Sequence, residues 1–361
     1  MSNRPVHGGN LAWAASLANC SPSALLDFSA SINPVGPPPS AIAAIHSHLP
    51  DLHSYPDPAY RSLRAALGQF HGIPPDYILP GNGAAELLTW AGRELAELEF
   101  THLLTPAFSD YDRALSAFSA KVVPLPLHLL SEAWELGAWP EAALTQAGLL
   151  LNNPHNPTGK LFPQEVVWAA LQRYAIVVVD EAFMDFLPAD CQQSAIAWVQ
   201  EFPNLVIVRS LTKFYSLPGL RIGYAIAHPD RLKRWQQWRD PWSVNGLAVA
   251  VGEVVVQDRE FQQQTFAWLA QAKPQLFTGL ASLPGLHPYP SAANFFLVRC
   301  DRSVTQIQAQ LLQYHQILIR DCLSFPELGD RFFRVAVRSS SENQRLLQGL
   351  GEILSHSPSA L

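Results

Sequence analysis

Cysteine, lysine and long apolar runs are all scarce in this sequence of 361 residues. The four cysteines are scattered and form no C-x-x-C pair, which favours reduced thiols over a disulfide framework or a zinc site. No apolar stretch approaches the roughly 18 to 20 residues that a membrane span requires, and the polar first ten residues show no secretory signal. We therefore expect a soluble, cytoplasmic protein without a metal or a membrane partner.

Basic charge is also limited. Lys plus Arg total 24 against 30 Asp plus Glu, which gives a net charge of −6, and no basic run supplies the patch that a phosphate backbone requires. We therefore expect no nucleic-acid partner. Apolar residues are plentiful, because 48% of the chain is hydrophobic, which is enough for the core of one large or two ordinary domains.

Short runs rich in strand-forming residues recur through the middle of the chain, separated by stretches of helical length and pattern. The strand runs are residues 77–80, 101–104, 121–127, 148–152, 175–180, 205–210 and 222–226, and helical patterns cover 85–98, 109–119 and 164–174. Continuously apolar strands that alternate with helices indicate a mostly parallel sheet covered on both faces. We predict an α/β fold with a seven-stranded sheet.

The pattern changes after about residue 246. A long helical pattern runs through 269, and strand-like runs at 294–299, 317–320 and 332–337 are flanked by helical patterns at 304–314 and 341–353. This arrangement is typical of a smaller α+β domain. We predict that residues 46–245 form the large domain and that residues 1–45 join residues 246–361 in the small one. A cleft between two domains is where ligands usually bind.

Lys213, one of only five lysines, stands just beyond an apolar strand in the run S-L-T-K that begins at Ser210. A desolvated lysine has a lowered pKa and can form a Schiff base with an aldehyde. Neighbouring hydroxyls and the guanidinium of Arg221 would suit a phosphate carried by that aldehyde. Taken alone, the pattern also fits a solvated lysine in a loop.

Asp180 ends the apolar strand 175–180, and the carboxyl end of a strand faces the ligand crevice in open α/β sheets. A carboxylate there can keep a pyridinium nitrogen protonated, as pyridoxal phosphate chemistry requires, although a helix cap or a Mg²⁺ ligand fits the position equally well. Upstream, G-N-G at 81–83 follows a short strand and opens a helix whose N-terminus can receive a phosphate. A simple turn also explains such glycines.

Two further residues follow strands in the same part of the chain. Asn156, held between two prolines in N-P-H-N-P-T-G, can donate a hydrogen bond to a phenolic oxygen of a cofactor ring, and Phe108 can stack on the face of that ring. Each could also be an ordinary turn asparagine or core phenylalanine. The ordered occurrence of all these groups at strand ends is what indicates a cofactor site.

The ordered set Y-P-D-P, G-N-G, N-P-H-N-P-T-G, D-E-A-F and S-x-T-K…R-x-G resembles fold-type-I pyridoxal-phosphate enzymes of the class-I/II aminotransferase group, over essentially the whole chain. Within that group, H-G-G-N at 7–10 and D-F-S-A-S-I-N-P at 27–34 resemble the threonine-phosphate decarboxylases of cobalamin biosynthesis. The nearest relatives of those decarboxylases are the histidinol-phosphate aminotransferases.

The resemblance implies a role for each residue around the cofactor ring. Lys213 would bind pyridoxal 5′-phosphate covalently, and Asp180 would pair with its ring nitrogen. Asn156 would donate to the phenolic oxygen and also face the substrate, and Phe108 would stack on the ring.

The resemblance also implies how the cofactor phosphate is held. Gly83, Ala84, Ser210 and Arg221 would bind that phosphate within one subunit. Tyr55, in Y-P-D-P, would reach the cofactor phosphate of a neighbouring subunit. The implied assembly is a homodimer with composite active sites.

Two arginines near the C-terminus concern the substrate. Arg334 and Arg338 lie four residues apart in a strand-like run, which would place both on one face of the strand. Two guanidiniums in one cleft suit a small-molecule phosphorylated amino acid, which carries two anionic groups. By resemblance Arg334 would bind the α-carboxylate, whereas His7, Asn33 and Arg338 would meet the substrate phosphate. Arg338 also fits a solvated arginine on an edge strand.

The resemblance finally implies a reaction, the decarboxylation of L-threonine O-3-phosphate to (R)-1-amino-2-propanol O-2-phosphate and CO2. Many relatives carry tyrosine where this chain has Phe183, whose ring cannot donate a hydrogen bond, and this departure weakens a plain aminotransferase interpretation. Histidinol-phosphate transamination remains the alternative. A non-catalytic cofactor-binding regulator is a minor one, because the basic helix-turn-helix domain that such regulators append does not fit before Tyr55.

Overall fold

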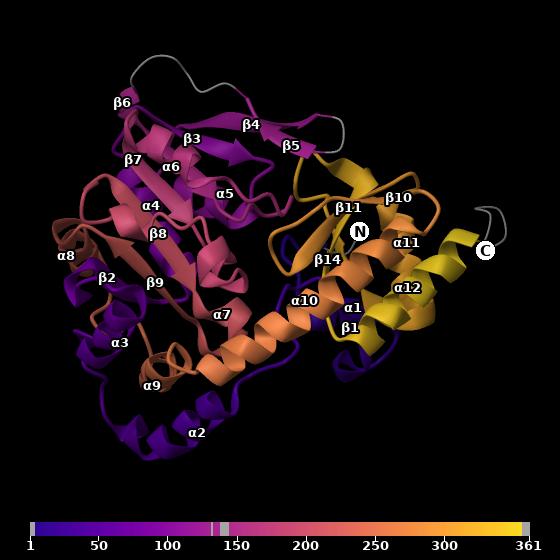
Figure 1. The fold of residues 1–361 in the computed structure, drawn as a ribbon, viewed down its shortest axis with the longest axis horizontal. Helices are drawn as coiled ribbons and strands as arrows, with labels where there is room; N and C mark the ends of the chain where they lie inside the picture. The colour runs from indigo at the N-terminus through magenta and orange to yellow at the C-terminus, as the bar shows by residue number, and fades with distance from the viewer. Residues whose placement is uncertain (1–3, 131–132, 138–143, 356–361) are drawn as a thin grey trace.

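Two sheets of unequal size organise the computed structural model, which describes residues 4–130, 133–137 and 144–355 (Figure 1). The large sheet has eight strands in the order β2-β9-β8-β7-β6-β3-β4-β5. Its strands are β2 (Ile78–Asn82), β3 (Phe100–Thr105), β4 (Val122–Leu130), β5 (Ala133–Leu136), β6 (Leu144–Asn152), β7 (Tyr174–Asp180), β8 (Leu205–Ser210) and β9 (Ile222–Ala227). The five strands from β8 to β4 pair in parallel, whereas β9 runs antiparallel to both of its neighbours.

The prediction of a mostly parallel α/β sheet is confirmed, but its count of seven strands is wrong. All seven predicted strands are present, and β5 adds an eighth by folding back antiparallel on β4. A four-residue edge strand offers only two alternations of inward and outward side chains, which is too short a pattern to recognise in the sequence.

Side chains that alternate along the central strands pack on opposite faces of the large sheet. Leu150 and Val178 belong to an apolar cluster with helices α4 (Ala84–Leu95), α5 (Ser109–Ser116) and α8 (Pro229–Trp238). Leu149 and Val177 belong to the cluster that includes α3 (Arg61–His71), α6 (Gln164–Leu171) and α9 (Gly246–Val255). Because both faces are covered, the central strands are apolar throughout and not alternating.

The small sheet is antiparallel and has the order β10-β11-β14-β13. Its strands are β10 (Leu286–Pro288), β11 (Phe295–Cys300), β13 (Arg320–Asp321) and β14 (Phe332–Ala336), and helices α10 (Arg259–Ala281), α11 (Val304–Gln310) and α12 (Ser340–Ser355) accompany it. Figure 1 shows the two sheets side by side, with α10 extending from one toward the other. The helical pattern predicted from 246 to 269 is divided between α9 and α10, because the Asp258 carboxylate accepts a hydrogen bond from Phe261 N and caps a new helix.

The N-terminal residues join the C-terminal part of the chain. After α1 (Leu11–Ala18), strand β1 (Leu26–Asp27) pairs in parallel with β12 (Ile317–Leu318), so the predicted strand 317–320 is split between two sheets. Helix α2 (Pro39–His48) instead packs against α9, at the bottom of Figure 1. The exact division into domains at residues 45 and 245 stays a prediction.

Within residues 4–130, 133–137 and 144–355, no helix combines the length and the apolar character needed to traverse a bilayer. The same residues contain no cluster of three histidine, cysteine or acidic side chains arranged to hold a metal ion.

Candidate active site

A cavity of about 300 Å³ opens at the carboxyl ends of β6, β7 and β8, bounded also by β14 and by the N-terminal segment. Parallel strands deliver their C-terminal residues to one edge of the sheet, which is where α/β proteins bind ligands. The sequence-predicted residues that line this cavity are His7, Ala84, Phe108, Asn156, Asp180, Ser210, Lys213, Arg221 and Arg334. Segments more than 300 residues apart in the chain therefore meet in one site.

Lys213 lies in α7 (Leu211–Phe214), a single helical turn directly after β8. The Ser210 hydroxyl caps this turn by accepting a hydrogen bond from Thr212 N, so the chain turns into the cavity as soon as the strand ends. Burial of the amine, together with the neighbouring cations Arg334 and Arg221, lowers the pKa of Lys213 to about 8. An amine with such a pKa is available as a nucleophile near neutral pH.

Asp180 ends β7 with its carboxylate held by two donors. The Tyr111 hydroxyl donates to Oδ2 at 2.7 Å, and Ala182 N donates to Oδ1 at 2.9 Å. Burial raises the pKa of Asp180 to about 6, while the two hydrogen bonds and the Lys213 cation oppose that rise. The carboxylate is therefore oriented, largely desolvated and well placed to pair with a cationic nitrogen.

The start of α4 forms an anion cradle with Arg221. Gly83, the N-cap residue, has a φ of +74°, and a Cβ built there would lie 2.3 Å from the Arg221 guanidinium. Only glycine permits so close an approach of the guanidinium to the helix N-terminus. The Ser210 and Thr212 hydroxyls, 2.8 Å apart, border the same cavity. Backbone N–H groups, hydroxyls and a guanidinium together form a site that can hold a phosphate.

Arg334 reaches the cavity from β14. Its guanidinium donates to Asn156 Oδ1 and, at 3.2 Å, to the carbonyl of Ser29, and it lies 4.9 Å from the centre of the Phe295 ring. Its Nε is buried and has no hydrogen-bond partner among the described residues. A buried guanidinium with an unused donor beside a cavity is suited to bind an anionic ligand group.

His7 belongs to an N-terminal segment that lies along the cavity. Its Nδ1 is 3.3 Å from the Ser109 hydroxyl, and its ring centre is 5.5 Å from that of Phe108. Arg320 anchors this segment by donating to the carbonyl of Val6 and to the Ser324 hydroxyl. Sequence reasoning missed Arg320, because its neighbours in the chain form no recognisable motif.

Four of the predicted residues do not line the cavity. Gly83 lies directly beside it, as the N-cap of α4, and the other three lie elsewhere. Asn33 is buried behind it, where its amide donates to the Phe214 carbonyl and the Thr265 hydroxyl, both at 2.8 Å. Arg338 lies beyond the end of β14, so it does not share a strand face with Arg334; it pairs with Glu342 at 2.7 Å. Tyr55 is 79% exposed. The expectation that both arginines point into one cleft is therefore corrected.

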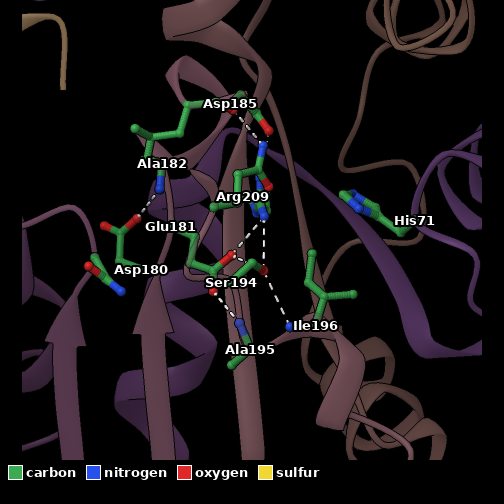
Figure 2. Close-up of polar contacts among 12 residues, drawn as sticks. His71, Asp180, Glu181, Ala182, Asp185, Ser194, Ala195, Ile196 and Arg209 are labelled. Carbon is green, nitrogen blue, oxygen red and sulfur yellow. Dashed lines mark hydrogen bonds and ion pairs between the residues drawn. The ribbon is translucent and has the colours of Figure 1, made fainter. Parts of the chain in front are cut away.

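Sequence reasoning also missed a buried ion cluster directly behind Asp180. Figure 2 shows Arg209, on β8, between the carboxylates of Glu181 and Asp185. The Arg209 guanidinium lies 2.8 Å from Glu181 and 2.5 Å from Asp185, and it donates to the Ser194 hydroxyl at 3.0 Å. The cluster joins the turn that follows Asp180 to the strand that leads to Lys213. A charged residue inside the apolar run L-V-I-V-R-S was the available signal.

The fold and this site define a family. Residues 23–350 match the family model described as aminotransferase class I and II, and the chain belongs to that family.

Two proteins of similar sequence and one solved structure of similar fold can be compared with this chain. The chain is 38% identical to threonine-phosphate decarboxylase of Salmonella typhimurium over 97% of this chain and 96% of that protein. It is 37% identical to a histidinol-phosphate aminotransferase of Symbiobacterium thermophilum, covering 88% of this chain and 87% of that protein. A histidinol-phosphate aminotransferase of Sinorhizobium meliloti, solved with pyridoxal-5′-phosphate, superposes with a TM-score of 0.83 at 22% identity, over 98% of each chain.

The protein is accordingly a pyridoxal-phosphate-dependent enzyme, and the residues present fit that cofactor. The cavity offers a lysine of lowered pKa, a buried carboxylate and a glycine-lined anion cradle. When bound, the cofactor supplies an electron sink for a bond broken at the α-carbon of an amino acid.

Proposed function

We propose that this enzyme decarboxylates L-threonine O-3-phosphate to (R)-1-amino-2-propanol O-2-phosphate and CO2, a step of cobalamin biosynthesis. The main support is the 38% identity to a threonine-phosphate decarboxylase along nearly the full length of both chains. The structural observation that favours it is the position of His7 and Gly8, in the decarboxylase-like H-G-G-N segment, in the wall of the cavity that contains Lys213.

The same proposal assigns roles around the cofactor. Lys213 would hold the cofactor aldehyde covalently and would be the group that moves a proton at the substrate α-carbon. Asp180 keeps the ring nitrogen protonated, Asn156 donates to the phenolic oxygen and Phe108 stacks on the ring. The phosphate is held by Gly83, Ala84, Ser210 and Arg221.

Substrate recognition requires two anion sites at different distances from Lys213. Arg334 binds the α-carboxylate, since its unpaired Nε and its contact with Asn156 place a cation beside the cofactor site. His7 meets the substrate phosphate from the N-terminal segment. Arg334 and His7 would select decarboxylation by fixing the orientation of the α-carboxylate beside the bound cofactor, which would supply the electron sink for the bond that breaks.

Two assays on the reconstituted enzyme decide the reaction. One measures CO2 release from L-threonine O-3-phosphate, and the other measures glutamate formation from histidinol phosphate and 2-oxoglutarate. We expect product in the first and little in the second. Product in the second assay alone would overturn the proposal in favour of transamination, which the 37% identity to a histidinol-phosphate aminotransferase makes the second candidate.

Variants of the substrate site sharpen this test. Arg334→Met should lower kcat/KM for threonine phosphate by about a hundredfold, because a charge-assisted bond to the carboxylate is worth roughly 1.5 to 3 kcal/mol. Arg345→Met, at an exposed position of α12 outside the cavity, is the matched control and should retain kcat/KM within about threefold.

We further propose that the enzyme is a homodimer in which Tyr55 contributes to the active site of the partner subunit. Tyr55 is 79% exposed and lies against Trp242, with ring centres 4.5 Å apart. An exposed aromatic pair of this kind is typical of a surface that another protein chain covers.

A further inference from the structure

The helix that receives the cofactor phosphate carries an acidic residue in its own first turn. Glu86 is the third residue of α4, directly after the cradle formed by Gly83 and Ala84. Its Oε2 accepts a hydrogen bond from Asn82 N at 2.6 Å, and its Oε1 accepts one from Trp90 Nε1 at 3.0 Å. Glu86 therefore fixes the G-N-G turn in the shape that leaves the helix N-terminus open to an anion.

This arrangement has an electrostatic cost. The Glu86 side chain is only 16% exposed, so water screens its charge weakly. A second anion, the cofactor phosphate, is to bind within one helical turn of it, and two negative charges so close repel each other. The helix dipole favours either anion but does not remove the repulsion between them.

Arg239 lies where it can cancel that charge. It follows α8 immediately, and its side chain is only 4% exposed. Its Nε is 3.0 Å from Glu86 Oε1, and its NH1 donates at 2.6 Å to the carbonyl of Pro80, in the middle of β2. One guanidinium thus neutralises Glu86 and holds the strand that leads into the G-N-G turn.

We propose that Arg239 is a positioning residue for cofactor binding: it neutralises Glu86, so that the N-terminus of α4 can accept the cofactor phosphate. Arg221 contacts Gly83 and is the cation of the cradle itself, whereas Arg239 acts through Glu86. The inference rests on the cofactor of this family and not on the choice between decarboxylation and transamination.

The test compares the binding of two aldehydes to the apoprotein by equilibrium dialysis. Pyridoxal phosphate and pyridoxal share the same ring, so a variant that changes the affinity for the first and not for the second acts on the phosphate. We expect Arg239→Met to weaken binding of pyridoxal phosphate by about tenfold and that of pyridoxal by less than about twofold. Adding Glu86→Gln in the same chain should restore most of the lost affinity, because the amide keeps an acceptor for Asn82 N without the charge.

Two controls keep the inference falsifiable if Arg239→Met folds poorly. Glu86→Gln alone leaves Arg239 unpaired, so pyridoxal phosphate should bind about threefold more tightly or better at low ionic strength, with pyridoxal unchanged. Arg239→Lys keeps the charge and should retain most of the phosphate selectivity. Equal weakening of both aldehydes in Arg239→Met, or no rescue by Glu86→Gln, would mean that the pair is only structural. These outcomes are independent of the CO2 and glutamate assays.

Discussion

The reactivity of the Lys213 amine depends on its surroundings and not only on its being a lysine. An exposed lysine amine is almost wholly protonated at neutral pH, whereas burial and two neighbouring guanidiniums bring the pKa of Lys213 to about 8. The same burial raises the pKa of Asp180 to about 6. Burial disfavours the charged form of each group, so it lowers the pKa of the amine and raises that of the carboxyl.

The lowered pKa of Lys213 predicts how the rate of cofactor loading depends on pH. Only the neutral amine attacks an aldehyde, so the rate of loading apoprotein should rise through pH 8 and level off above it. The rise in visible absorbance after pyridoxal phosphate is added measures this rate. Arg334→Met removes a neighbouring cation and should shift the midpoint upward. A midpoint near 10.5 in the unmodified protein, the ordinary value for lysine, would contradict the assignment.

Stability of the apoprotein should change in the same window. Between pH 8 and 10.5 the unfolded chain keeps the Lys213 proton that the folded chain has lost, so the free energy of unfolding contributed by this residue increases with pH.

Single residues could be predicted from the sequence where a motif at a strand end carried them. Lys213, Asp180 and Asn156 are such residues, and all line the cavity. Tyr111 could not be found in this way, because it reaches Asp180 from α5 and its sequence neighbourhood resembles any half-buried helix. The prediction for Arg338 was wrong because it assumed that the strand containing Arg334 continues to residue 338. Strand β14 ends two residues earlier, at Ala336.

At the scale of elements, the Arg209 cluster fixes the relation between β7 and β8. Glu181 and Asp185 both follow β7, Arg209 belongs to β8, and all three are at least nine-tenths buried. The backbone reinforces the contact, since Glu181 N donates to the Val208 carbonyl at 2.8 Å. Asp180 ends β7 and Lys213 lies in the helical turn that follows β8, so the cluster sets the relative position of the two groups proposed to hold the cofactor.

Replacement of Arg209, the cation that Glu181 and Asp185 share, should therefore lower the stability of the protein. Arg209→Met leaves two buried carboxylates unpaired, and breaking such a cluster is expected to lower the free energy of unfolding by about 3 to 5 kcal/mol. Urea denaturation of the apoprotein measures the change. Arg345→Met, at an exposed position of α12, is the matched control and should alter stability by less than about 0.5 kcal/mol. Equal stability of the two variants would show that the cluster contributes no net stabilisation.

At the scale of the whole molecule, the parallel sheet could be predicted because each buried strand is apolar throughout and is followed by a helix. The splitting of residues 317–320 between two sheets could not, because β12 and β13 have two residues each and their partners, β1 and β14, lie elsewhere in the chain. Pairing between distant segments leaves no periodic signal in either of them. For the same reason, the contact between the N-terminal segment and Arg320 could not be predicted from the sequence.

The surface around α2 is where a second subunit would bind. Large apolar side chains are exposed on and after this helix, among them Ile42, Leu49 and Leu52, and Tyr55, which packs against Trp242, follows them in the chain. Burial of about 25 cal/mol per Å2 of such surface favours association, and Tyr55 lies at the end of this apolar stretch. The proposed dimer would thus cover the exposed side chains and deliver Tyr55 to the partner's cofactor phosphate in one step.

Mixing two defective variants tests this shared site. Lys213→Ala lacks the amine proposed to bind the cofactor, and Tyr55→Ala lacks the residue proposed to act on the neighbouring site, so each alone should have little activity. In a mixed dimer, one site combines Lys213 of one subunit with the partner subunit's Tyr55 and is intact. After the two proteins are unfolded and refolded together, the decarboxylase or aminotransferase activity should exceed the sum of the separately refolded samples. Tyr314→Ala, which removes another exposed tyrosine at 48% exposure, should stay fully active by itself. If co-refolding gives no gain while light scattering shows a dimer, Tyr55 does not act across the interface.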